Sequence, residues 1–255
     1  MAGPVANMVD IWKKKPFKYI PPSPPAELIE TTSYTLDFAN RKFVHIGIEP
    51  TEKYQVIDPS EKYQVVVNLL TSSRHVKILP DFLQRIFSMM GHILSYILDV
   101  PQKYKRTIFL ETEFYKISSM MYCGENVLVI ESKTEDGCRV LLNRCDLIRL
   151  QHLEACIYES IVRKTIYTTQ LVIEQGDTFM AYLRNKCDLL QSPPKNLEDM
   201  VTFVKNVQDE RTSKSFPNLT GQIQMFATKQ LAESLLNRVT HEVIHKFNIK
   251  LLQYI

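Results

Sequence analysis

Apolar and polar residues alternate along the chain from residue 33 onward, in the pattern typical of β-strands. In the segment 41–48, Val44, Ile46 and Ile48 fall on one side, and charged or aromatic residues fall on the other. The segment 63–69 alternates in the same way, and its β-branched residues suit a pleated, half-buried surface. A Thr-Ser-Ser turn then leads to a short last strand. We therefore predict three strands and a short fourth.

A helix is predicted directly after these strands. Pro80 suits its first turn, where the missing N–H costs nothing. Apolar residues then recur at spacings of three and four, which marks one apolar stripe: Leu83, Ile86, Phe87, Met90, Ile93, Leu94 and Ile97. The segment Asp99-Val100-Pro101 ends the helix.

The same order of elements is repeated between residues 107 and 164. Strands are predicted at 114–121, 127–131 and 138–142, separated by a Cys-Gly-Glu-Asn turn and an Asp-Gly turn. Asn143 is a suitable N-cap for the second helix. That helix carries the apolar stripe Leu147, Leu150, Leu153, Ile157 and Ile161.

These patterns predict an α+β protein with two tandem antiparallel sheet-plus-helix units (ββββα twice). Three or four strands with a single helix leave one sheet face bare, so we expect the units to pack as a pseudo-dimer. The predicted domains are a disordered tail at 1–30, the first unit at 31–103, the second unit at 104–165, and a mainly helical C-terminal region at 166–255.

The N-terminal tail combines a Trp-Lys-Lys-Lys-Pro-Phe-Lys cluster with a Pro-Pro-Ser-Pro-Pro run. It contains too few apolar residues to fold alone. It suits either a basic arm on nucleic acid or a polyproline segment that docks on a protein partner.

In the C-terminal region we predict a further strand at 167–174, a helix at 196–208 and a long helix at 220–247. The long helix contains His241-Glu242-Val243-Ile244-His245, a sequence that on a helix places two imidazoles for zinc with the Glu as general base. Ten residues follow His245, and none is His, Asp, Glu or Cys, so no third ligand follows downstream. A zinc-dependent hydrolase therefore ranks as an alternative only.

Composition limits the class of protein. Hydrophobic residues make up 45% and charged residues 23%, as in ordinary globular domains. No run approaches the roughly 18 apolar residues of a membrane span, and Met1–Tyr19 has no apolar core of a secretory signal. The five cysteines include no C-x-x-C pair, which favours reduced thiols and no zinc ribbon. We expect a nuclear or cytoplasmic protein without membrane contact, cofactor or metal.

The order of strands and helix, given twice, resembles the single-stranded-DNA-binding superfamily of the transcriptional coactivator positive cofactor four and the plant Whirly proteins. The segment Lys116–Ile161 is most similar to a coactivator unit: a strand, a Gly-Glu-Asn turn, a Val-Leu-Val-Ile strand, an acidic turn, a Val-Leu-Leu strand and the helix. Where that family has a Lys-Gly-Lys turn, this chain has Gly124-Glu125-Asn126. The resemblance covers residues 33–164 and implies a single-stranded nucleic-acid-binding surface on the strands.

Charge and aromatic residues suggest where that surface lies. Residues 31–106 carry 10 Lys and Arg against 7 Asp and Glu, whereas residues 107–165 carry 7 against 9. Single-strand binding needs a basic groove with aromatic platforms. In the first unit the candidate contacts are Arg41, Lys42, Phe43, Lys62, Arg74, His75 and Lys77. In the second they are Lys116, Tyr122, Lys133 and Arg139, with Phe114 as a further aromatic.

The sequence thus predicts a non-enzymatic protein that binds single-stranded nucleic acid, DNA in preference to RNA and largely without sequence specificity. Such a protein acts in replication, transcription or genome handling, as viral or nuclear replication factors do, and we expect it to self-associate. The main alternative is a structural or assembly protein that uses the same fold for protein contacts, which the weak positive charge favours.

Overall fold

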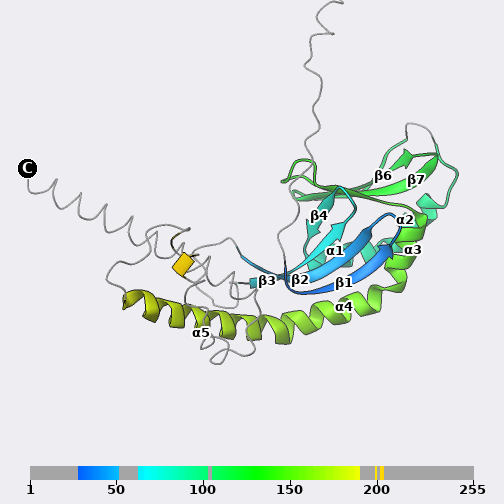
Figure 1. Cartoon of the computed structure of the whole chain (residues 1–255). Coiled ribbons are helices and arrows are strands. Elements are labelled where there is room, and N and C mark those ends of the chain that lie inside the picture. Colours follow the sequence, from blue (N-terminus) through cyan, green and yellow to red (C-terminus); the bar gives the residue numbers. More distant parts are fainter. Residues whose placement is uncertain (1–27, 52–62, 103–104, 190–198, 200–201, 204–255) are drawn as a thin grey trace, which may run out of the picture.

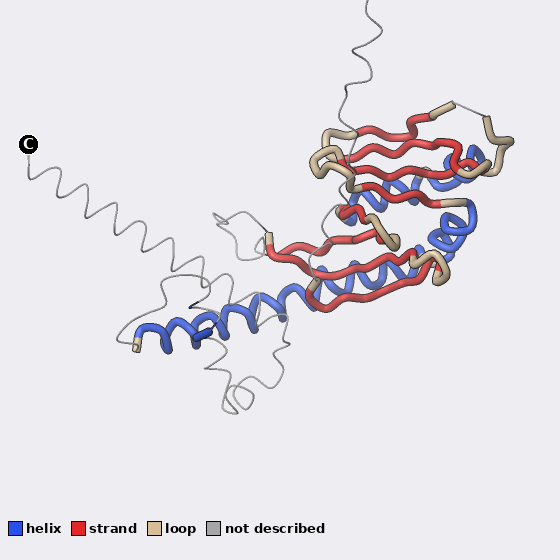
Figure 2. Tube along the Cα trace, turned by 45° about the horizontal axis from the view of Figure 1, so that its top comes forward, coloured by secondary structure: helices blue, strands red, loops and turns tan. Residues whose placement is uncertain are grey.

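The strands form two four-stranded antiparallel sheets, as predicted. The structure is a computed structural model that describes residues 28–51, 63–102, 105–189, 199 and 202–203. The first sheet, in the order β1-β2-β3-β4, contains β1 (Ile29–Asp37), β2 (Lys42–Pro50), β3 (Tyr63–Leu70) and β4 (His75–Ile78). The second, in the order β5-β6-β7-β8, contains β5 (Thr107–Glu111), β6 (Tyr115–Tyr122), β7 (Glu125–Ser132) and β8 (Arg139–Leu142). The chain is therefore an α+β protein with two sheets (Figures 1 and 2).

Each sheet is followed by two short helices where the sequence predicted one. The first sheet is followed by α1 (Pro80–Ser88) and α2 (Met90–Ile97), and the second by α3 (Arg144–His152) and α4 (Glu154–Arg163). The breaks occur at Met89 (φ −97°, ψ 0°) and Leu153 (φ −88°, ψ −2°). In both units the break follows a first helix of nine residues.

The predicted starts of both helical segments are confirmed. Pro80 occupies the first turn of α1. Asn143 caps α3 through a capping box with Asp146: the Asp146 N–H donates to Asn143 Oδ1 at 3.0 Å, and the Asn143 N–H donates to Asp146 Oδ2 at 2.8 Å. Two orphan N–H groups are satisfied at once.

The turn between β6 and β7 is tighter than predicted. Tyr122 and Glu125 are paired, and Cys123 (φ 49°) and Gly124 (φ 85°) both have positive φ, as a type I′ hairpin requires. Asn126 consequently lies in β7. Its side-chain amide donates to the carbonyls of Tyr96 at 3.3 Å and Asp99 at 3.0 Å, which joins β7 to the end of α2.

The hydrophobic core is a single cluster that contains residues from both units. Val44, Ile46 and Ile48 of the first sheet are buried in the same cluster as Ile117 and Leu128 of the second. Helix α2 contacts β7, whereas α3 contacts β1 and α4 contacts β2. Each unit therefore has helices that contact the sheet of the other unit, while α1 and α3 also contact β3 and β8 of their own units.

Polar bonds reinforce the contact between the units. The Tyr34 hydroxyl lies 2.6 Å from Ser160 Oγ, and Arg149 donates to the Leu36 carbonyl at 2.5 Å. Lys42 Nζ bonds Asp146 Oδ2 at 2.5 Å, and the Asp146 side chain is only 1% exposed. The carboxylate that caps α3 is thus neutralised by a lysine from β2.

The strand predicted at 167–174 is wrong. Residues 164–168 form a π-helical turn, η3 (Lys164–Thr168), and α5 (Thr169–Asp188) continues from it. Figure 1 shows α4 and α5 as one long, gently curved rod beneath the first sheet. The buried residues Val172, Ile173, Gly176 and Phe179 follow helical spacing. Packing of this face outweighs the β propensity of the many Thr and Ile residues in the segment.

Several predictions fall outside the described residues. Most of the N-terminal tail lies outside them, although Leu28 and Ile29 are buried and β1 begins at Ile29. The long helix predicted at 220–247, with its His-Glu-x-x-His sequence, lies outside them entirely. Among the described residues, no helix has the length and apolar character needed to cross a membrane.

The buried pair between Lys42 and Asp146 generates a stability prediction. Lys42→Met removes the cation but keeps the aliphatic stem, and it leaves the buried carboxylate without its partner. We expect the free energy of unfolding to fall by about 3 kcal/mol, because removal of the lysine leaves the buried Asp146 carboxylate without a neutralising cation. Urea denaturation measures this.

The matched control is Lys116→Met. Lys116 Nζ lies 3.8 Å from Glu111, whose side chain is 42% exposed, so the loss should stay below about 1 kcal/mol. Equal losses for the two variants would contradict a special role of the buried pair.

Candidate nucleic-acid interface

Three of the predicted contact residues share the outer face of the first sheet. The strand register aligns Phe43 with Leu70 and His75 in one row, and His45 with Asn68 and Lys77 in the next. Directly paired residues lie on the same face of a sheet. Phe43, His75 and Lys77 are therefore on one side with His45, opposite the side that carries the core.

Much of this outer face is already engaged. Lys77 Nζ lies 3.1 Å from Glu49 Oε1, which neutralises its charge. A Cβ on Gly47 would lie 2.5 Å from Leu28 Cβ, so the residue before β1 packs closely on β2 here. Burial lowers the pKa of His45, so this imidazole is neutral at pH 7. The face thus offers an aromatic edge at Phe43 and little free positive charge.

The outer face of the second sheet carries an alternating row of charges. In the strand register, Lys116 of β6 lies opposite Glu131 of β7, and Glu131 lies opposite Arg139 of β8. Arg106 lies 2.9 Å from the Glu131 carboxylate, and Lys133 lies 3.2 Å from Glu111. Arg139 is exposed and forms no ion pair with any other residue that the structure describes.

A groove between the two units collects four predicted contacts. Its volume is about 470 Å³, and it is bordered by the Thr71–Arg74 turn of the first unit and by the β6–β7 hairpin and β8 of the second. The predicted contacts in its lining are Lys42, Arg74, Tyr122 and Arg139. Residues that the sequence assigned to separate units therefore meet at one site.

The groove combines cationic, aromatic and hydroxyl groups. Tyr122 is 54% exposed, so its ring is available for stacking. Arg139 projects from the edge of the second sheet, and Ser72 and Ser73 are exposed in the turn. Lys42 is engaged by Asp146, and Glu125 adds one negative charge to the lining. The arrangement can hold a phosphate beside a stacked base.

The other predicted contacts are not among the residues that line this groove. Arg41 is exposed in the turn between β1 and β2, with φ 51°. Lys116 and Lys133 are paired with Glu111. His75 is 7% exposed, and its Nε2 lies 3.7 Å from Cys138 Sγ. Lys62 lies outside the described residues.

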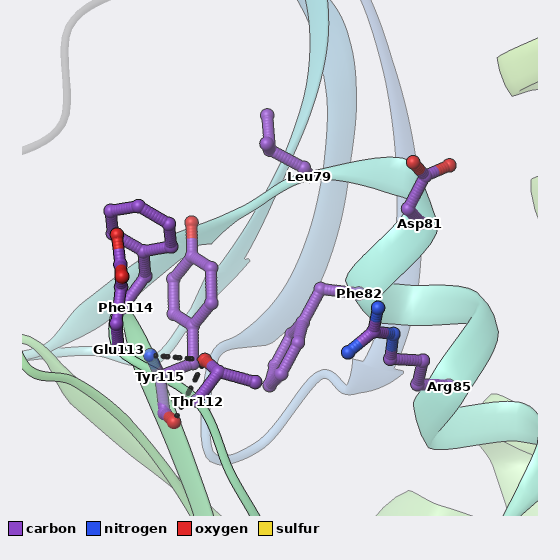
Figure 3. Close-up of a pocket in the computed structure, with 8 residues that line it drawn as sticks. All are labelled: Leu79, Asp81, Phe82, Arg85, Thr112, Glu113, Phe114 and Tyr115. Carbon is purple, nitrogen blue, oxygen red and sulfur yellow. Dashed lines mark hydrogen bonds between the residues drawn. The ribbon is translucent and has the colours of Figure 1, made fainter.

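Sequence reasoning missed an aromatic cavity of about 340 Å³ between α1 and the β5–β6 turn. Figure 3 shows Phe82 beside Tyr115, with Arg85 close by; the ring centroids of Phe82 and Tyr115 lie 4.5 Å apart. Phe114 is 52% exposed at the rim. Phe82 belongs to α1 and Tyr115 to β6 of the other unit, so no local sequence pattern predicts their contact.

A second missed feature is a cluster of His75, Glu135 and Cys138. Their ligand-type atoms all lie within 4.8 Å of one another, and His75 Nε2 is 3.7 Å from Cys138 Sγ. His75 and Cys138 are buried, and Glu135 is exposed. Burial, followed by the hydrogen bond with Glu135, raises the pKa of the Cys138 thiol to about 11.

No protein-family model matches the sequence, and no curated protein matches it.

The raised pKa of Cys138 generates a labelling prediction. At pH 8 about 0.1% of such a thiol is thiolate, against about a quarter for an ordinary cysteine. In metal-free protein, iodoacetamide should therefore modify Cys138 at least about a hundredfold more slowly than the exposed Cys145 and Cys156. Peptide mass spectrometry over a time course measures the rates.

The control is the same reaction in urea, where the three rates should converge. Equal rates for Cys138 and Cys145 in the folded protein would contradict the buried, protonated state.

Proposed function

We propose that this chain binds single-stranded nucleic acid, DNA in preference to RNA and largely without sequence specificity, in replication, transcription or genome handling. The observation that carries the proposal is the groove between the units, which gathers Arg74, Tyr122 and Arg139. Single-strand binding uses cations along the backbone and aromatic rings under the bases, and this groove contains both.

The position of the groove supports a single strand as the ligand. One wall is the Thr71–Arg74 turn, which carries three hydroxyl side chains. The other wall is the β6–β7 hairpin together with the edge strand β8. The described residues offer no helix that projects into this groove, as a major-groove reader would need. Arg139, free of ion pairs with described residues, is the cation best able to meet a phosphate.

We further propose that the two units are an internal duplication packed as a pseudo-dimer, as in the coactivator-like and Whirly-like superfamily that the sequence resembles. The shared strand order supports this, as do the breaks after nine helical residues in both units. Strand β4 contacts its counterpart β8, and the second helix of each unit contacts a central strand of the other sheet, α2 on β7 and α4 on β2, as an approximate two-fold relation between the units would give.

The rival function is that of a structural or assembly protein. One observation favours it: Lys42, Lys77, Lys116 and Lys133 are all paired with carboxylates. A surface that neutralises its own lysines attracts phosphate weakly. Self-association, a protein partner for the proline-rich tail, and a nuclear or cytoplasmic location remain part of the proposal.

Fluorescence anisotropy with labelled single-stranded and duplex DNA, at two salt concentrations, tests the function. We expect tighter binding to the single strand and an affinity that falls with salt. If the protein binds neither DNA nor the matching RNA at either salt concentration, the result favours the assembly protein.

Two substitutions in the groove separate charge from stacking. Arg139→Ala should weaken binding and reduce the slope of log affinity against log salt by about one. Tyr122→Ala should cost about 1–3 kcal/mol with little change in slope, because stacking releases no counterion. Both are read from the anisotropy titrations.

Arg163→Ala is the matched control, because Arg163 is exposed on α4, away from the groove. It should bind like the parent. If Arg139→Ala and Tyr122→Ala also bind like the parent, the groove is not the binding site.

The pseudo-dimer predicts that neither unit folds alone. Expressed separately, 28–103 and 104–164 should each give a broad, non-cooperative thermal transition, because each exposes core that the other unit covers. Circular dichroism and sedimentation measure this, with 28–189 as the control that keeps both units. Two folded, monomeric halves would contradict the pseudo-dimer.

A further inference from the structure

We propose that His75, Glu135 and Cys138 form a zinc site that ties the first unit to the second. This inference is independent of nucleic-acid binding, and it departs from the expectation of a metal-free protein. It rests on three ligand-type side chains from two units that converge on one point.

The geometry fits a tetrahedral metal ion. Zinc bonds of about 2.3 Å to sulfur and 2.0–2.1 Å to nitrogen give an S···N edge of about 3.5 Å in a tetrahedron. His75 Nε2 and Cys138 Sγ are 3.7 Å apart, close to that edge. All three ligand atoms lie within 4.8 Å of one another, with His75 and Cys138 buried and Glu135 exposed.

The fold positions these residues by two separate devices. The Cys138 N–H donates to the Glu135 carbonyl at 3.3 Å, and Gly137 adopts φ 77°, so a tight turn brings the carboxylate and the thiol of one loop together. His75 is the first residue of β4, which contacts β7 and β8. The histidine therefore comes from the first unit and the other two ligands from the second.

The ligand chemistry selects zinc among the common divalent ions. Mg²⁺ and Ca²⁺ prefer oxygen ligands throughout, whereas a thiolate with an imidazole favours zinc. Three protein ligands leave a fourth tetrahedral position for water or an external donor. The charge of the nearby Lys77 is neutralised by Glu49, whose Oε1 lies 3.1 Å from Lys77 Nζ, so it repels a bound cation less.

A bound dication would stabilise the Cys138 thiolate and the Glu135 carboxylate together. Zinc binding should therefore release a proton and stabilise the folded chain, since it binds the folded state alone.

Cobalt substitution tests the site directly. The full chain, stripped of metal with a chelator, is titrated with Co²⁺ and then with Zn²⁺. We expect a near-ultraviolet thiolate-to-cobalt charge-transfer band that saturates at one equivalent and disappears when zinc displaces cobalt. Zinc should also raise the melting temperature.

Variants assign the ligands. Cys138→Ser should abolish the charge-transfer band, and Glu135→Gln, a surface change that leaves the core intact, should weaken zinc binding by about tenfold or more. His75→Gln should abolish the zinc-dependent rise in melting temperature. Circular dichroism checks that each variant folds.

Two controls separate this site from other donors. Cys145→Ser removes an exposed thiol on α3 and should keep the band. The double variant His241→Ala/His245→Ala removes the His-Glu-x-x-His imidazoles and should also keep it. The proposal is overturned if the parent shows no charge-transfer band, if Cys138→Ser retains it, or if zinc leaves the melting temperature unchanged.

Discussion

The structure depends on one constraint: each sheet has to bury its inner face, and part of that cover comes from helices of the other unit. Burial of apolar surface drives folding, and an uncovered row such as Val44, Ile46 and Ile48 would forfeit it. The chain meets this constraint by exchange, with α2 on the second sheet and α3 and α4 on the first. The groove and the His75 cluster both lie where the units meet, so they exist only because of this exchange.

The same packing decides which charges remain available. Lys42 lies on a strand of the first unit, yet its ammonium group neutralises the capping carboxylate of a helix in the second. Lys77 and Lys116 are paired with glutamates on the same sheet faces. Positive residues counted from the sequence therefore overstate the field that a ligand meets, and in the groove Arg139 is a lining cation without an ion pair to any described residue.

The sequence predicted the elements well because their signals are local. Alternation at 41–48, Pro80 at a helix start and the Asn143 cap each act through neighbours in the chain, and the structure confirms all three. The strand predicted at 167–174 is wrong. Its β-branched residues favour a strand locally, whereas the face that packs against the rest of the chain requires a helix. The meeting of His75 with Cys138, or of Lys42 with Asp146, depends on how distant units dock. No local pattern encodes those contacts, so the candidate site was predicted only as scattered residues.

The long separation between these partners has a consequence during synthesis. Strand pairing within the first sheet joins consecutive segments and needs no later residue. Helix α1 of the same unit contacts β3, but the rest of its helical cover includes α3 and α4 of the second unit, and Lys42 and Asp146 are 104 residues apart. At about 5–20 residues per second, a ribosome takes on the order of 5–20 s to supply that cover. Until then the part of the first sheet that α3 and α4 cover stays open to water, so the nascent chain exposes apolar surface of the kind that favours aggregation.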